Sequence, residues 1–307
     1  MSTHKTILFG TPKFAVPSLQ KLIETGFSVE AVVTTPDEPT GRKGASTPPP
    51  VKVFAQEKGL KVLQPLTLKD DSFFEEFTKI NPDICIVVAY GKIIHQRYLD
   101  IPKYGFVNIH PSLLPRYRGP SPIQSAILNG DPETGVTLMR IDEEMDHGPI
   151  LKQIEYQISK EKKYEEIEKE LAEIGAQILV DTLPDYLNEK ITSREQDHNR
   201  ATFCKKYERP DGRIDWSKPA EKIYNQIRAL NPNPGVWTTL NDKTLNIFDA
   251  EIVDFNSQDK VIKEKSRFLI RASDKYISPT LLQLEGKKIL PIKDFLNGLR
   301  KKTLIIK

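Results

Sequence analysis

Residues 83–89 read DICIVVA, and this stretch decides the fold. Its apolar run from Ile84 to Val88 is mostly β-branched and too short for a typical helix. Such a run is typical of a strand buried on both faces, as in a parallel sheet that helices cover on either side. Cys85 lies inside this run, so we expect a buried core thiol.

Strands and helices alternate around this stretch. The predicted strands are 6–9, 29–34, 61–63, 83–89 and 105–110, with a further strand-like stretch at 135–141, and the predicted helices are 15–24, 51–58 and 72–80. Pro12 suits the entry of the first helix and Gly26 its exit. This order predicts an α/β fold with a doubly wound, mostly parallel sheet and right-handed crossovers.

The second half of the chain has a different pattern. Apolar residues at helical spacing predict a long amphipathic helix over 160–187, and the polar stretch 188–210 is typical of a linker. A helix is expected over 219–230, with Ser217 as its cap. Four short strands are predicted after it, which favours a small β-barrel: 236–240, 244–252, 267–272 and 276–284. We therefore expect domains at 1–189 and 209–307, joined by a linker at 190–208.

Charge is divided unevenly along the chain. The 307 residues carry a net charge of only +3, but residues 205–307 have 21 Lys and Arg against 13 Asp and Glu. The C-terminal part is therefore +8, and residues 1–204 are −5. A basic part of this kind favours a polyanion as its partner. The alternative is an unevenly charged, solvated surface.

Several classes of protein are disfavoured by composition. Two cysteines exclude a disulfide scaffold and a Cys-rich zinc module. No apolar run approaches the roughly 18 residues of a membrane span, so a cytoplasmic chain without membrane contact is expected. The histidines share no ligand spacing, which predicts no metal site. No dinucleotide or Walker glycine pattern is present, and nothing indicates an obligate dimer, so a monomer is expected.

The chemistry is concentrated in residues 107–119, VNIHPSLLPRYRG. Asn108 and His110 are two apart on a predicted strand, so their side chains point to the same face. They stand at the carboxyl end of that strand, where open α/β sheets bind ligands. An amide that donates to an oxyanion and an imidazole that moves a proton suit acyl transfer. The alternative is that both residues merely end a strand.

A carboxylate partner for the imidazole is expected in the later turn MDHG, 145–148. Asp146 precedes a glycine turn that could return it to His110 and orient the ring. The neighbouring acidic residues 142–144 leave open the alternative of a surface turn.

At this point the sequence resembles the methionyl-tRNA formyltransferase family over essentially the whole chain. The resemblance rests on NxH at 108–110 and on these blocks: GTPKFA (10–15), PDEPTGR (36–42), VAYG (88–91), SLLPRYRG (112–119), ETGV (133–136), MDHG (145–148), RIDW (213–216) and RALNP (228–232). It implies a Rossmann-like domain followed by an oligonucleotide-binding-type (OB-like) barrel. It also implies transfer of a formyl group from 10-formyltetrahydrofolate, as co-substrate, to methionyl initiator tRNA.

The resemblance also implies roles for single residues. Matching positions assign catalysis to Asn108, His110 and Asp146, and tRNA contact to Arg42. The folate contacts fall on Ser112, Leu113, Leu114 and Pro115. The chain departs from the family after Arg42, where KGAST carries fewer basic residues than is usual.

Other functions are weighed against this one. A sugar-nucleotide N-formyltransferase shares the NxH and SLLP blocks, but the GTP block and the Arg42 loop speak against it. A glycinamide ribonucleotide formyltransferase would leave the last hundred residues unused, and the hydrolase of the same folate usually heads a longer chain. A non-catalytic folate-binding or RNA-binding protein would have no reason to keep Asn108, His110 and Asp146.

Overall fold

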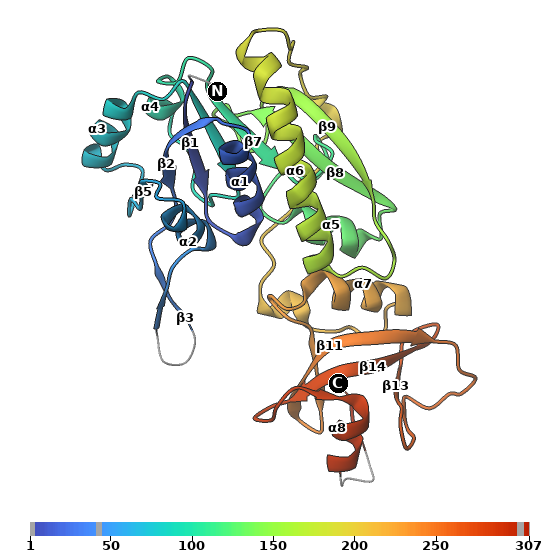
Figure 1. Cartoon of the computed structure of the whole chain (residues 1–307). Coiled ribbons are helices and arrows are strands. Elements are labelled where there is room, and N and C mark those ends of the chain that lie inside the picture. Colours follow the sequence, from blue (N-terminus) through green and yellow to red (C-terminus); the bar gives the residue numbers. More distant parts are fainter. Residues whose placement is uncertain (1–3, 41–44, 300–303, 307) are drawn as a thin grey trace. The chain divides into compact units, whose positions relative to one another are not determined.

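A computed structural model describes residues 4–40, 45–299 and 304–306, and the chain forms two compact units (Figure 1). Unit 1 comprises 1–122, 133–157 and 168–204. Unit 2 comprises 123–132, 158–167 and 205–307. Each unit combines three separate stretches of the chain that contact one another. The domain boundaries expected from the sequence stay a prediction.

Unit 1 is built on a seven-stranded sheet with the order β5-β2-β1-β6-β7-β8-β9. The strands are β1 (Lys5–Gly10), β2 (Ser28–Val33), β5 (Val62–Leu63), β6 (Ile84–Val88), β7 (Phe106–His110), β8 (Glu133–Arg140) and β9 (Ile150–Gln157). The first five pair in parallel, and β8 and β9 add antiparallel strands after β7. The predicted doubly wound, mostly parallel sheet is confirmed, whereas β9 has no counterpart among the predicted strands.

Helices follow the strands of unit 1 in the predicted order. They are η1 (Lys13–Ala15), α1 (Val16–Glu24), α2 (Pro50–Glu57), α3 (Asp71–Ile80), α4 (Gln96–Leu99) and α6 (Tyr164–Leu187, from Glu168 onward). The core between sheet and α3 joins Phe9 of β1 and Val87 of β6 to Phe73 and Phe77. A Cβ on Gly175 of α6 would lie 2.7 Å from Ile109 Cγ2, so only a glycine allows this close packing of α6 on β7.

Unit 2 is an antiparallel sheet with the order β10-β11-β14-β13-β12, to which β15 adds by pairing with β14. The strands are β10 (Trp237–Leu240), β11 (Lys243–Val253), β12 (Val261–Lys263), β13 (Phe268–Arg271), β14 (Tyr276–Leu284) and β15 (Leu290–Pro291). The helices are α5 (Pro122–Asn129, from Ile123 onward), η3 (Arg209–Gly212), α7 (Ala220–Leu230) and α8 (Ile292–Gly298). This half-barrel confirms the predicted C-terminal β architecture.

One predicted cap is wrong. Helix α7 begins at Ala220 with Pro219 at the N-cap position, and the Oδ1 atom of Asp274 accepts the Ala220 N–H at 2.7 Å. Ser217 instead donates its hydroxyl to Asp215. The cap therefore comes from a residue far along the chain, which local sequence could not indicate.

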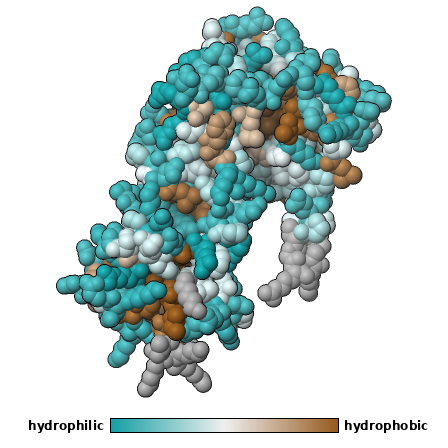
Figure 2. Space-filling model, turned by 180° about the vertical axis from the view of Figure 1, so that it is seen from behind, coloured by the Kyte–Doolittle hydropathy of each residue, from teal (hydrophilic) through white to brown (hydrophobic). Residues whose placement is uncertain are grey.

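The remaining elements are short. Strands β3 (Glu38–Thr40) and β4 (Ala45–Thr47) form a hairpin, and η2 (His198–Arg200) is a single turn. The face drawn in Figure 2 is mostly hydrophilic, with hydrophobic residues in separate spots. None of the helices in the described ranges has the length and apolarity needed to cross a membrane.

Candidate active site

The carboxyl end of β7 carries Asn108 and His110. They share one face of the strand, and Val107 and Ile109 are buried on the other. Because β7 lies between β6 and β8, this strand end is inside the sheet rather than at its edge. Within the described part of the chain no hydrogen bond is made by the side-chain amide of Asn108, which leaves the amide for a ligand.

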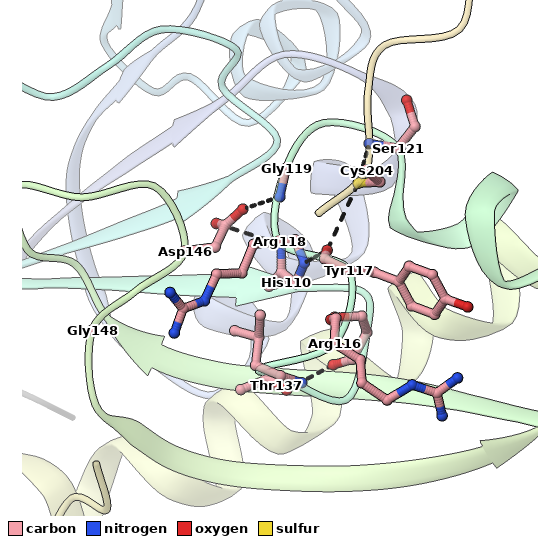
Figure 3. A network of polar contacts seen from close by, with 12 residues as sticks. His110, Arg116, Tyr117, Arg118, Gly119, Ser121, Thr137, Asp146, Gly148 and Cys204 are labelled. Carbon is pink, nitrogen blue, oxygen red and sulfur yellow. Dashed lines mark hydrogen bonds and ion pairs between the residues drawn. The ribbon is translucent and has the colours of Figure 1, made fainter. Parts of the chain in front are cut away.

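His110 is held at both ring nitrogens. Its side chain is buried, and its Nε2 atom donates to the carbonyl oxygen of Tyr117 at 2.9 Å. A carbonyl can only accept, so Nε2 carries a hydrogen. On the other side of the ring, Nδ1 lies 3.5 Å from the Oδ1 atom of Asp146 (Figure 3). The ring is thus oriented by two oxygen atoms from two separate loops.

Asp146 is the carboxylate that reaches His110. Its second oxygen, Oδ2, accepts the backbone N–H of Gly119 at 2.7 Å, so both carboxylate oxygens are engaged. Its backbone has a φ of 51°, in the left-handed region. The Oδ2 atom of Asp142, in the same acidic turn, lies instead 2.7 Å from the Nδ1 atom of His147. The structure therefore places Asp146, and not Asp142, beside His110.

The SLLP block forms a tightly bonded loop after β7. The hydroxyl of Ser112 donates to a main-chain carbonyl four residues later at 2.6 Å, and Thr137 donates its own hydroxyl to the Ser112 carbonyl. Ser112 and Leu114 are buried, whereas Leu113 and Pro115 keep part of their surface exposed. Contact of this block with folate stays a prediction, and the exposed part of Leu113 and Pro115 is where it would be made.

Arg42, the predicted tRNA contact, lies outside the described residues. The structure describes the two strands of the hairpin, β3 and β4, and Asp37 directly precedes β3. The Asp37 carboxylate accepts from Gln64 Nε2 at 2.7 Å and from Lys52 Nζ at 2.8 Å. The hydrogen bond from Gln64 and then that from Lys52 lower the pKa of Asp37.

Two buried polar residues beside the site were missed by the sequence analysis. Arg118 and Gln196 are each only 4% exposed, and their side chains hydrogen-bond to each other. Arg118 lies within the SLLPRYRG block, so a cation in the loop next to His110 was a usable signal. Gln196 gave none, because its polar surroundings are typical of a linker.

Cys85 of β6 carries a fully buried thiol. Burial raises the pKa of the Cys85 thiol well above its ordinary value, which keeps the thiol uncharged and unreactive. Among the residues that the structure describes, no group of three His, Cys, Asp or Glu side chains could hold a metal ion.

Comparison with a solved structure agrees with this architecture. The N-formyltransferase from Helicobacter canadensis, in complex with folinic acid and dTDP-3-aminofucose, superposes with a TM-score of 0.69 over 91% of this chain and 99% of that one. Its sequence is 21% identical, so the likeness concerns the fold alone.

Sequence comparison goes further. Residues 4–183 match the family model described as "Formyl transferase", and residues 206–300 match "Formyl transferase, C-terminal domain". The methionyl-tRNA formyltransferase of Thermodesulfovibrio yellowstonii is 40% identical over 293 residues, which cover 95% of each chain. That of Caldicellulosiruptor saccharolyticus is 42% identical over 300 residues, 95% of this chain and 96% of the relative. The chain therefore belongs to the methionyl-tRNA formyltransferase family and is a formyl-group transferase.

Proposed function

We propose that the chain transfers the formyl group of 10-formyltetrahydrofolate to the free amino group of methionyl initiator tRNA. The observation that carries this proposal is one constellation at the end of β7. Asn108 offers an amide with no internal hydrogen bond among the described residues, on the same face as His110, whose ring faces the Asp146 carboxylate at 3.5 Å. Acyl transfer needs this pair of functions, an oxyanion donor and a positioned proton carrier.

In the proposed reaction the neutral amine of the methionyl group attacks the formyl carbon. The new C–N bond forms, and the bond from the formyl carbon to N10 of the folate breaks. Asn108 donates to the oxyanion that develops on the formyl oxygen. Because Nε2 of His110 already donates a hydrogen to Tyr117, Nδ1, which faces Asp146, is the ring nitrogen that takes the proton leaving the amine. Tetrahydrofolate gains one proton at N10.

Substrate binding is divided between separate parts of the chain. The folate is held next to the SLLP block, where Leu113 and Pro115 keep exposed surface. The tRNA backbone is bound by residues 209–307, within the C-terminal part that carries a net charge of +8. Arg42 positions the acceptor end.

A two-acceptor assay tests the proposal. Purified protein is incubated with 10-formyltetrahydrofolate and either methionylated initiator tRNA or an amino-sugar nucleotide, and formylated product is measured. Formylation of the tRNA alone is expected. Formylation of the sugar nucleotide alone would assign the chain to the sugar-nucleotide class instead, and no product with either acceptor would contradict the proposed function.

A further inference from the structure

The segment 194–204, called the strap here, lies against the loops that hold His110 and Asp146. At its start the strap pairs with β9, because Arg194 and Ile150 exchange both backbone hydrogen bonds at 2.7 and 2.8 Å. At its end, Thr202 and Cys204 exchange backbone hydrogen bonds with the loop 115–118. The strap belongs to unit 1 together with these loops. The strap is therefore bonded to unit 1 at both ends and is not a flexible linker, although its composition is polar.

Arg118 fixes the middle of the strap. Its Nε and Nη2 atoms donate to the Oε1 atom of Gln196 at 3.2 and 2.8 Å, and Nη2 also donates to His198 Nδ1 at 2.8 Å. A guanidinium has only donors, so it must face the oxygen of the Gln196 amide and not the nitrogen. The amide NH₂ is thereby directed away from Arg118.

The directed NH₂ group meets the turn that carries Asp146. Gln196 Nε2 donates to the carbonyl oxygen of Asp146 at 2.9 Å and to that of Gly148 at 2.8 Å. This turn is unusual, since Asp146 has a φ of 51° and a Cβ on Gly148 would lie 2.1 Å from the Arg140 carbonyl oxygen. A non-glycine residue in the left-handed region persists only where its surroundings hold it.

We propose that Gln196 is a positioning residue for Asp146, and that Arg118 fixes the orientation of its amide. Gln196 holds the strained turn by two donated hydrogen bonds, and the turn presents the Asp146 carboxylate to His110. This inference rests on the proposed function, because it assumes that Asp146 acts in formyl transfer. It makes the strap part of the catalytic centre.

The alternative is that Gln196 merely docks the strap onto Arg118, and Gln196→Glu separates the two roles. A carboxylate keeps the acceptor for Arg118 and adds an ion pair, so a docking role would be preserved. The same carboxylate has no hydrogen to donate, and it faces the carbonyls of Asp146 and Gly148 with a repelling oxygen. A positioning role would therefore be lost.

The test measures kcat and KM for both substrates together with thermal unfolding. We expect Gln196→Glu to lower kcat about tenfold to a hundredfold, because a small misplacement of a catalytic group has this effect. KM should stay within about twofold, and the protein should stay folded. The matched control is Glu195→Gln, an exposed position on the same strap, which should behave as wild type.

A double-mutant cycle shows whether Gln196 acts through Asp146. In an Asp146→Asn background, Gln196→Glu should lower kcat by less than about twofold further, because coupled residues are not additive. If Gln196→Glu fails to fold, Gln196→Met replaces it in the double-mutant cycle alone, because methionine also lacks the acceptor for Arg118 and a lowered kcat would not by itself separate the two roles. Wild-type kcat for the folded variant, or full additivity with Asp146→Asn, would overturn the inference. An inactive wild type would instead contradict the proposed function.

Discussion

At the scale of single residues, the site combines a free amide with a restrained imidazole. The side-chain amide of Asn108 has no hydrogen-bond partner among the described residues, whereas His110 is held by the Tyr117 carbonyl and faced by Asp146. The Asn108 amide is available to donate a hydrogen bond to the oxyanion that develops during the reaction. The His110 ring is held in one orientation by two contacts, so it does not have to turn when it takes part in proton transfer. Replacing either residue is therefore expected to lower turnover while the protein stays folded, whereas replacing a packing residue lowers stability.

Removing either side chain should reduce catalysis without unfolding the protein. Asn108→Ala and His110→Ala are each expected to lower turnover by about a hundredfold or more, the usual cost of losing an oxyanion donor or an acid–base group. Turnover is measured at saturating folate and tRNA, beside circular dichroism. Near-wild-type turnover in either variant would remove that residue from the proposed mechanism.

The carboxylate beside His110 can be tested against its neighbour. Asp146→Asn is expected to lower kcat, because the amide cannot replace the carboxylate that faces the imidazole. Asp142→Asn is the matched control, since Asp142 pairs with His147 in the same turn. A larger loss from Asp142→Asn than from Asp146→Asn would mean that the wrong carboxylate has been assigned.

At the scale of elements, polar contacts of the Asp37 carboxylate link the base of the β3–β4 hairpin to its neighbours. Asp37 accepts from Gln64 and Lys52, and these bonds bring together the strand end before the hairpin, helix α2 and the residue after β5. The base of the hairpin is therefore expected to depend on the ionised form of Asp37.

This dependence has a defined pH window. Hydrogen bonds lower the pKa of Asp37 below 3.8 in the folded chain, so its contribution is complete above that value and is lost as the pH falls through the lowered pKa. Asp37→Asn should lower the unfolding temperature at pH 7, and the difference from wild type should shrink in acid. Glu38→Gln, at an exposed neighbour, should change little. An equal difference at all pH values would contradict the role of the ionised carboxylate.

At the scale of the whole molecule, charge separates the chain into an acidic part and a basic part. Residues 1–204 have a net charge of −5 and residues 205–307 of +8. Binding to phosphates releases counterions, so a basic part that contacts tRNA makes affinity fall steeply with salt. The acidic part should contribute little to the salt dependence of tRNA affinity.

The salt dependence of tRNA affinity tests this division. Replacing the exposed Lys287 and Lys288 by Gln should weaken tRNA binding and reduce the salt slope by about one for each lost phosphate contact, without changing folate binding. The same replacement at Lys69 and Lys79, exposed in the acidic part, is the control. If both pairs reduce the slope equally, the basic part is not a dedicated tRNA-binding module.

The sequence by itself determined the features that depend on near neighbours in the chain. The buried run 84–88 predicted a central parallel strand, and the alternation of side chains placed Asn108 and His110 on one face. The first follows from an unbroken apolar run and the second from the two-residue repeat of a strand, and both can be recognised within a few consecutive residues. The family resemblance added the roles of these residues, and the comparisons confirmed the family.

Only the tertiary structure decided which distant residues meet. Asp142 and Asp146 lie in one acidic turn, and the fold brings Asp146 to His110, with Asp146 in the left-handed backbone region. Residues 190–208 have the composition of a linker, yet Gln196 is buried against that turn. Such contacts join parts of the chain that are far apart in the sequence. The residues next to a polar side chain in the sequence do not indicate whether it is solvated or buried. Its partners, and therefore its role, are set only when the whole unit packs.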